Sequence, residues 1–438
     1  MLVRLVAVVL LVLLSASAFQ LAYNVQLVWA DNPSSWPMFG HDPLHSGYSS
    51  STGPATNQTL WSYKTGGWVE CGPTVANGTV YVGSDDGKVY ALNALTGALV
   101  WEYQTVFFVY SSPAVVNGIV YVGSGGNVYA LNATTGALMW LYQTGSSVRS
   151  SPDIANGIVY VGSGDESSSP AVANGTVYFG TENDNVYALN ATTGVLVWKY
   201  NPADANGTVV EPPLSMLFTV YALNAFTGAP VWNYTTGNYV DSPAVANGIV
   251  YAGSWDHNVY ALNAVTGVLV WKYPTSSSVT SSPAVANLVV YIGSGSNVYA
   301  LNATTGALMW GIATSSIQVY SPAVAGGVVY VGSWEGHVYA LNATTGASVW
   351  KYETGGGGGE VGSSPAVANG VAYAGSTDDK VYAFGPRSQG TDYTVPFVVA
   401  AVIIVAAIAS FVVAVVRRER KRPPLDSALS RPENGPKE

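Results

Sequence analysis

The residues best suited to chemistry in this sequence are acidic and aromatic side chains that recur in short turns between apolar runs. Five such turns are Asp85-Asp86-Gly87, Glu182-Asn183-Asp184, Trp255-Asp256-His257, Trp334-Glu335-Gly336 and Asp378-Asp379. Carboxylates accept hydrogen bonds and indoles offer a flat apolar surface, so a ring of these turns could bind a sugar or a loop of a partner protein. The candidate binding residues are Trp255, Asp256, His257, Trp334, Glu335 and His337. The alternative is that Asp, Asn and Gly occur here because they form good turns.

Catalytic and metal-binding patterns are missing from the sequence. The four histidines are His41, His45, His257 and His337, and none has the spacing to a cysteine or another histidine that a zinc site requires. There is no G-x-S-x-G, phosphate-binding loop or H-E-x-x-H motif, and no turn has EF-hand spacing. The single cysteine, Cys71, excludes an intramolecular disulfide. We therefore predict no catalytic residue, no metal site and no cofactor.

The elements that would position these turns form a repeat. The segment Val-Tyr-Ala-Leu-Asn begins at Val89, Val128, Val186, Val220, Val259, Val298 and Val338, with a variant at Val381. A tryptophan follows each of the first seven copies, at Trp101, Trp140, Trp198, Trp232, Trp271, Trp310 and Trp350, mostly in steps of 39 or 40 residues. Short β-branched and aromatic runs alternate with Asn-Gly, Gly-Ser and Thr-Gly turns. A period of about 40 residues predicts an all-β propeller with four strands per blade.

The number of blades depends on one irregular region. Eight Ser-Pro-x-Val-like starts indicate eight blades, but the Trp140 to Trp198 interval is stretched to 58 residues and carries a duplicated strand pair at 151–163. The next interval is short, and its segment 202–220 is degraded. We predict eight blades, with seven as the alternative. An early tryptophan, Trp61, predicts that an N-terminal strand completes the last blade and closes the ring.

The unit Val-Tyr-Ala-Leu-Asn-Ala-x-Thr-Gly-x-x-x-Trp resembles the PQQ-type propeller repeat of quinoproteins, and the lead-in from Ser35 to Gly47 resembles the segment that opens many such propellers. The resemblance covers residues 35–385 and extends to the outer-membrane-assembly propeller lipoproteins. It implies that each tryptophan packs between adjacent blades, that Thr-Gly forms a turn, and that His41 and His45 are structural. It also implies an alternative function, because PQQ-dependent alcohol or sugar dehydrogenases with a Ca²⁺ site share the repeat. Those enzymes usually carry paired adjacent cysteines, which a chain with one cysteine lacks.

The sequences at the two ends of the chain predict export across the membrane and a membrane anchor. Residues 1–18 read as a secretory signal peptide, with cleavage after residue 30 as the alternative and an uncleaved anchor as a further one. Residues 386–396 form a linker, and 397–416 are apolar over the length of a transmembrane helix. The tail, 417–438, opens with six residues of which five are basic, which predicts a cytoplasmic tail and an extracellular propeller.

Charge and sequons limit the partners. Between the two apolar ends lie 8 Lys and Arg against 21 Asp and Glu, a net charge near −13 that argues against binding to nucleic acid. Nine Asn-x-Ser/Thr sequons are candidate glycosylation sites, although turn chemistry also accounts for several: Asn57, Asn77, Asn132, Asn174, Asn190, Asn206, Asn233, Asn302 and Asn342. The sequence thus predicts a single-pass cell-surface propeller that binds or scaffolds a protein, peptide or glycan, and is not an enzyme.

Overall fold

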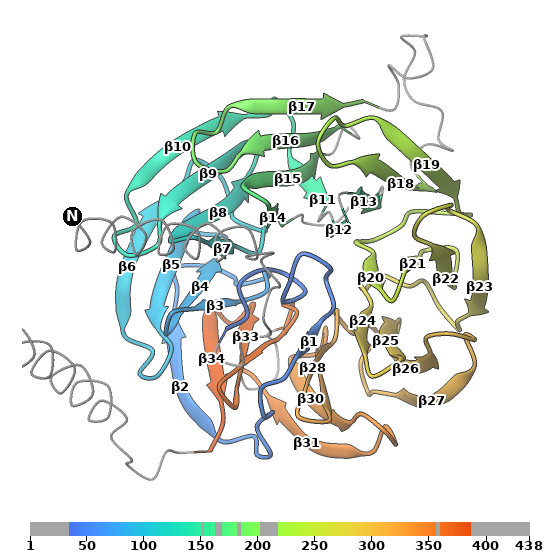
Figure 1. Cartoon of the computed structure of the whole chain (residues 1–438). Coiled ribbons are helices and arrows are strands. Elements are labelled where there is room, and N and C mark those ends of the chain that lie inside the picture. The colour runs from blue at the N-terminus through green and yellow to red at the C-terminus, as the bar shows by residue number, and fades with distance from the viewer. Residues whose placement is uncertain are drawn as a thin grey trace, which may run out of the picture. The chain divides into compact units, whose positions relative to one another are not determined.

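The computed structural model describes residues 35–150, 153–156, 158–162, 169–181, 185–201, 218–355 and 360–386. Their strands form eight sheets that follow one another around a ring (Figure 1). The innermost strands of neighbouring sheets lie side by side all the way round, from β32 (Ala366–Ala368) through to β28 (Ala323–Ala325) and back to β32. The prediction of an all-β propeller is therefore confirmed.

Six sheets are each built from four consecutive strands, numbered from the centre outward. They are β3 (Thr74–Ala76), β4 (Thr79–Gly83), β5 (Lys88–Asn93), β6 (Leu99–Gln104); β7 (Ala114–Val116), β8 (Ile119–Ser124), β9 (Asn127–Asn132), β10 (Leu138–Gln143); β14 (Ala171–Ala173), β15 (Thr176–Thr181), β16 (Val186–Asn190), β17 (Leu196–Tyr200); β20 (Ala244–Ala246), β21 (Ile249–Ser254), β22 (Asn258–Asn263), β23 (Leu269–Pro274); β24 (Ala284–Ala286), β25 (Val289–Ser294), β26 (Asn297–Asn302), β27 (Leu308–Ala313); and β28, β29 (Val328–Gly332), β30 (His337–Asn342), β31 (Ser348–Glu353). Two short strands, β1 (Tyr48–Ser49) and β11 (Val148–Ser150), pair with β28 and β15.

The seventh sheet closes the ring. Its three inner strands, β32, β33 (Val371–Ser376) and β34 (Lys380–Phe384), come from the C-terminal end of the propeller. Its outermost strand, β2 (Thr59–Lys64), comes from the N-terminal end and pairs antiparallel with β34, with Trp61 opposite Ala383. This closure sheet confirms the predicted role of the N-terminal strand.

The eighth sheet is composite. Its inner strands, β12 (Asp153–Ala155) and β13 (Ile158–Gly162), precede the β14–β17 sheet in the chain, whereas its outer strands, β18 (Thr219–Asn224) and β19 (Pro230–Thr235), follow it. Seven sheets are thus blades of the usual kind, which is the predicted alternative, and the prediction of eight such blades is wrong because the eighth sheet is assembled from two separate segments of the chain. The duplicated strand pair at 151–163 supplies the inner half that the shortened repeat lacks.

Tryptophan holds neighbouring sheets together throughout the ring. The Trp271 indole N–H donates to the Ala303 carbonyl of the next sheet at 2.8 Å, and its ring covers Gly306, where a Cβ would approach to 2.7 Å. Gly306 has a φ of +72°. Only glycine tolerates both the positive φ and the close approach of the indole ring without strain, which explains the Thr-Gly turn. Equivalent indole bonds start from Trp61, Trp101, Trp140, Trp198, Trp232, Trp310 and Trp350.

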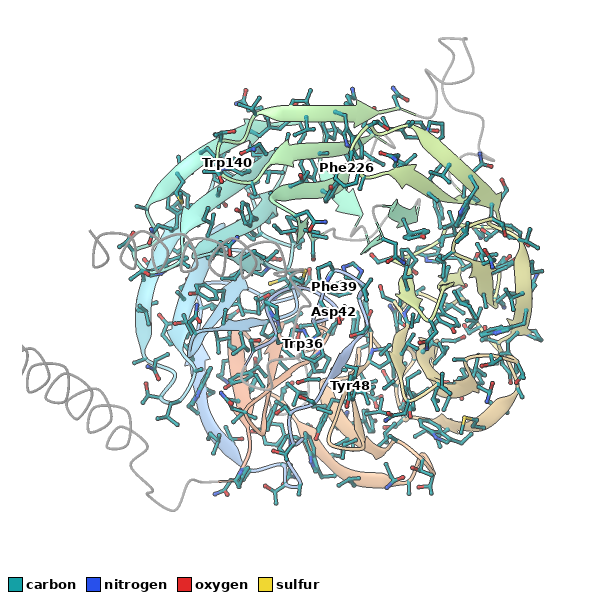
Figure 2. All side chains as sticks on the ribbon, viewed as in Figure 1. Trp36, Phe39, Asp42, Tyr48, Trp140 and Phe226 are labelled. Atoms are coloured by element: carbon teal, nitrogen blue, oxygen red, sulfur yellow. The ribbon has the colours of Figure 1, made fainter. Side chains whose placement is uncertain are left out.

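The lead-in, residues 35–50, lies at the centre of the ring, where Figure 2 shows Trp36, Phe39 and Asp42. Its carbonyls accept backbone N–H groups from the free edges of innermost strands: Val75 donates to Trp36 at 2.7 Å, Val285 to Ser46 at 2.7 Å and Val324 to Gly47 at 2.7 Å. The lead-in therefore satisfies edges that would otherwise face the channel.

The two end segments of the sequence lie outside the described residues. This applies to the predicted signal peptide, the linker beyond Pro386, the transmembrane segment 397–416 and the basic tail. In the part of the chain that the structure describes, no helix is long and apolar enough to cross a membrane.

Candidate binding face

The ring has two ends that differ in their connections. One end carries the turns between first and second strands and between third and fourth strands, and we call it the turn face. The other end carries the turns between second and third strands and the longer connections from one sheet to the next, and we call it the loop face. All six predicted binding residues lie on the loop face, in the β21–β22 turn and in or beside the β29–β30 turn.

The two predicted triplets do not form one cluster. The β20–β23 and β28–β31 sheets that carry them are separated by the β24–β27 sheet. Among the described residues, no hydrogen bond or ring contact joins Trp255, Asp256 or His257 to Trp334, Glu335 or His337. Any ligand that touches both triplets must therefore extend across a whole sheet.

The two carboxylates of these triplets serve the turns themselves. Asp256 Oδ2 accepts the Gly237 N–H at 2.9 Å and the Tyr260 hydroxyl at 2.5 Å, which ties the turn to the loop after the composite sheet. Burial alone would raise the pKa of Asp256, but these hydrogen bonds outweigh burial and lower it. Glu335 likewise accepts the Ser315 hydroxyl at 2.6 Å and the Tyr339 hydroxyl at 3.1 Å.

The aromatic and histidine side chains of the triplets differ in their availability. Trp255 is half-buried, donates its indole N–H to Asp241 Oδ2 at 3.2 Å and packs edge-on against Tyr239. Trp334 is 44% exposed, and His257 is exposed with a φ of 68°. The pKa of His337 is lowered by burial and by the nearby Lys351 charge. Trp334 and His257 are therefore the members best placed to meet a ligand.

A larger apolar group lies elsewhere on the loop face. The β2–β3 and β6–β7 loops flank the same turn, because Asp85 N–H donates to Trp68 O at 2.9 Å and Val109 N–H donates to Ser84 O at 3.2 Å. Their tips expose five apolar side chains, which we call the aromatic patch: Trp68, Val106, Phe107, Phe108 and Tyr110. Phe107 and Phe108 are each 56% exposed and Trp68 is 52% exposed.

The sequence did contain a signal for this patch. The β23–β24 loop, which is equivalent to the β6–β7 loop, reads Thr-Ser-Ser-Ser-Val-Thr from Thr275, whereas the β6–β7 loop reads Thr-Val-Phe-Phe-Val-Tyr from Thr105. The buried valine is kept in both, as Val279 and Val109. Only a comparison of loops between repeats would reveal that the neighbouring small polar residues are replaced by aromatic ones.

Carboxylates with raised pKa values lie beside the aromatic patch, where the closure sheet meets the first sheet. Burial, together with the charges of Glu70 and Asp86, raises the pKa of Asp85 to about 7. Burial also raises the pKa of Glu70, and burial and the Glu70 charge raise that of Glu360. Asp85 Oδ1 is buried without a hydrogen-bond partner among the described residues. Asp85 therefore holds its proton more strongly than an ordinary carboxylate does.

A small cavity lies at the centre of the ring. Its lining combines Trp36, Phe39 and His45 from the lead-in with Ser-Pro pairs at the start of innermost strands, such as Ser282-Pro283. Burial lowers the pKa of His45 to about 4, so this imidazole is neutral at physiological pH. The cavity lining contains no Lys, Arg, Asp or Glu.

This lining does not fit the cofactor pair that the fold implies. PQQ carries carboxylates that need cationic or amide partners, and Ca²⁺ takes six to eight oxygen ligands. In the residues described, no group of three or more His, Cys, Asp or Glu side chains is arranged to hold a metal ion. Cys71 is buried against Gly83, and burial raises its thiol pKa to about 12.

The described sequons gather mainly on the turn face. Asn77 and Asn174 occupy turns between first and second strands, and Asn132, Asn190, Asn302 and Asn342 open turns between third and fourth strands. In the latter turns Asn Oδ1 accepts two backbone N–H groups, as at Asn302 from Thr304 and Thr305. Asn57 and Asn233 lie before β2 and in β19, and Asn206 lies outside the described residues. Their glycosylation stays a prediction.

Comparison with known proteins agrees with this architecture. The family model described as outer membrane protein assembly factor BamB, a PQQ-like repeat model, matches residues 50–107, 109–169, 163–216, 214–319 and 317–388. The chain belongs to this family. The resemblance to PQQ-type repeats is thereby confirmed, whereas a comparison with curated proteins finds no match.

Solved structures extend the likeness of this PQQ-like repeat protein to both branches of the fold. BamB from Moraxella catarrhalis is 20% identical, with a TM-score of 0.60 over 75% of this chain and 99% of that one. The quinohemoprotein alcohol dehydrogenase from Comamonas testosteroni is 17% identical, with a TM-score of 0.63 over 82% of each chain. A europium-containing methanol dehydrogenase is 16% identical, with a TM-score of 0.65 over 81% of this chain and 98% of that one. At these identities the likeness shows the fold alone.

Proposed function

We propose that this PQQ-like repeat protein is a binding or scaffolding module whose loop face contacts a protein or peptide partner. The observation that carries the proposal is the aromatic patch, because three large rings more than half exposed on adjacent loops are unusual on a surface without a partner. Aromatic residues surrounded by polar groups are typical of the energetic centre of protein interfaces. The nearby carboxylate of Glu70, which is only partly buried, would favour a basic side chain in that partner.

The proposal includes a membrane anchor. The apolar run 397–416 is long enough to cross a bilayer, and the basic residues that follow it favour a cytoplasmic tail. The propeller would then lie outside the cell, where Trp334 and His257 could extend the contact surface around the loop face.

The partner hypothesis can be tested by site-specific photo-crosslinking in cells. A photoreactive residue replaces Tyr110, and a control chain carries it at Leu308 on the outermost strand β27. We expect a discrete crosslinked protein from position 110 that disappears when Phe107→Ser and Phe108→Ser are added, with the circular dichroism spectrum unchanged. Equal crosslinking from both positions, or persistence in the double variant, would count against the aromatic patch.

The dehydrogenase alternative needs its own measurement. The full chain is titrated with PQQ and Ca²⁺ while absorbance and dye-coupled alcohol or sugar oxidation are followed. The uncharged lining of the central cavity leads us to expect neither saturable binding nor turnover. Saturable binding with turnover would make the protein an enzyme and overturn the proposal.

A further inference from the structure

The turn face differs from the loop face in its charge. None of its described turns contains Asp, Glu, Lys or Arg: 77–78, 94–98, 117–118, 133–137, 174–175, 191–195, 225–229, 247–248, 264–268, 287–288, 303–307, 326–327, 343–347 and 369–370. The loop face, in contrast, carries Glu70, Asp85, Asp256, Glu335 and Glu360 among others. A surface without charges loses little solvation when water is removed from it.

The same turns expose apolar side chains that the fold does not require. Leu95, Phe226 and Val265 occupy the third position of Asn-Ala-x-Thr-Gly and are 73%, 70% and 70% exposed. The turn is held by the asparagine side chain and by the Thr at the fourth position, while other repeats have Thr at the third position. These three apolar side chains are therefore free to contact something outside the propeller.

The outermost strands continue this apolar surface around the rim. Each begins at the turn face, and five of them begin with an exposed apolar pair: Leu99-Val100, Leu138-Met139, Leu196-Val197, Leu269-Val270 and Leu308-Met309. Charged residues such as Glu102 and Lys272 follow further along the strands, toward the loop face. The rim is thus apolar next to the turn face and polar beyond it.

The chain also leaves the propeller at the turn face. Strand β34 runs from Lys380 at the loop face to Phe384. Gly385 then donates its N–H to Gln58 O at 3.0 Å and lies against Gly370, which belongs to a turn of the turn face. Residue 397, the first of the apolar run, follows within about 40 Å of fully extended chain.

We propose that the turn face and its apolar rim rest on the lipid surface of the membrane in which residues 397–416 are anchored. This inference depends on the proposed anchor. Apolar side chains of the turns would enter the boundary between headgroups and acyl chains. Because the turns carry no charge, the face would pay no free-energy cost for desolvating charged groups and would not be repelled by anionic headgroups. The loop face, with the aromatic patch, would then point away from the bilayer toward partners.

Depth-dependent quenching tests the orientation in the full chain reconstituted into phosphatidylcholine vesicles. Val265→Cys on the turn face and Ile317→Cys on the loop face carry an environment-sensitive fluorophore, and the two native side chains are 70% and 73% exposed. Cys71 is buried with a thiol pKa raised to about 12, so it does not compete for the label. Lipids with a spin label near the headgroup should quench most of the fluorescence at position 265 and leave position 317 unchanged.

A second variant separates contact from mere proximity. Leu95→Glu and Phe226→Glu, added to Val265→Cys, should remove the quenching while the circular dichroism spectrum stays the same. Equal quenching at both positions, quenching at 317 alone, or none at 265 would overturn the inference, as would glycans on Asn132 or Asn302 of the native protein. Extraction at alkaline pH tests the anchor separately, because a chain that resists extraction without quenching at 265 retains the anchor and refutes only the docking.

Discussion

The closure sheet and the composite sheet are both completed by strands from a separate part of the chain, but at different positions in the sheet. Both join strands that are not consecutive in the chain, yet the closure sheet borrows its outermost strand, β2, while the composite sheet borrows its two innermost strands, β12 and β13. In both, a Tyr and a Trp donate to one carbonyl of the next sheet: Tyr373 and Trp61 to Ala94, and Tyr160 and Trp232 to Ala264.

This comparison teaches what defines a blade in this protein. Chain continuity within a sheet is dispensable, because it is broken at two different positions. The contacts that bind each sheet to the next are kept in both cases, since they provide the burial of large aromatic rings that stabilises the ring. Disrupting these contacts should therefore show which of the two junctions the ring depends on more.

The largest effect is expected from Trp61→Ala in the closure sheet. Trp61 is 8% exposed, covers Gly97 and donates to Ala94 at 2.9 Å. Its loss should destabilise the propeller by about 3–5 kcal/mol, the usual range for buried aromatic truncation. Trp232→Ala in the composite sheet should cost less, because that side chain is only half-buried. Urea unfolding of both variants makes the comparison, and an equal or larger loss at Trp232 would contradict it.

A smaller loss is expected from Gly375→Ala, which tests how the closure sheet joins the two ends of the chain. A Cβ at Gly375 in β33 would lie 2.3 Å from Val69 Cγ1 and 2.6 Å from Val69 O, in the loop after β2. Overpacking of this kind costs about 1–3 kcal/mol. Gly78→Ala is the contrast, since its φ is positive at +75° and nothing lies within 4 Å of an added Cβ, so its cost reports backbone strain alone, whereas Gly375 has no positive φ and reports overpacking. We expect Gly375→Ala to lower the midpoint of thermal unfolding more than Gly78→Ala does.

The composite sheet can be tested by a double-mutant cycle. The rings of Tyr160 in β13 and Trp232 in β19 lie 5.8 Å apart. Tyr160→Ala and Trp232→Ala should therefore couple by about 1 kcal/mol, as contacting residues do, whereas Tyr160→Ala and Trp310→Ala should be additive within about 0.5 kcal/mol. Additivity of the first pair in urea unfolding would show that β13 does not belong to this sheet.

The smallest effect concerns pH at the closure junction. Because the pKa of Asp85 is raised to about 7 from 3.8, its contribution to stability is present at acidic pH and is lost as pH rises through about 7. Asp85→Asn should flatten this dependence and stabilise the protein at pH 8 by less than about 1 kcal/mol, since the group is partly solvated. Asp256→Asn is the contrast: its pKa is lowered, so its contribution is lost only as pH falls below the ordinary carboxylate range. A wild-type melting temperature independent of pH between 5 and 8 would be evidence against this account.

The repeat made much of the fold predictable. Trp61 alone indicated ring closure, and the spacing of Trp271, Trp310 and their equivalents gave the four-stranded sheets. The strand pairing of the composite sheet was not predictable, although the duplicated strand pair at 151–163 and the degraded segment 202–220 were both visible in the sequence. Strand pairing across an intervening sheet is non-local, and the β-branched pattern of β13 is satisfied by any neighbour that offers a free edge.

The candidate site was less predictable than the fold. Asp256 and Glu335 looked available for a ligand because carboxylates in turns are usually solvated, but tyrosines four residues later bond to them. The aromatic patch went unnoticed because Phe107 and Phe108 lie outside the repeated motif. A position that varies between repeats carries more functional information here than one that recurs, since the recurring residues hold the ring together.

The lead-in at the centre of the ring has a consequence for the order of folding. Residues 35–50 bond to β3, near the start of the propeller, and also to β24 and β28, near its end. The lead-in is synthesised before β24 and β28, so it cannot form its hydrogen bonds to these strands until they have folded. Contacts over such long sequence separations make folding slow. The first residues of the propeller to be synthesised are thus among the last to settle, and truncating them should leave a ring that assembles but opens more readily.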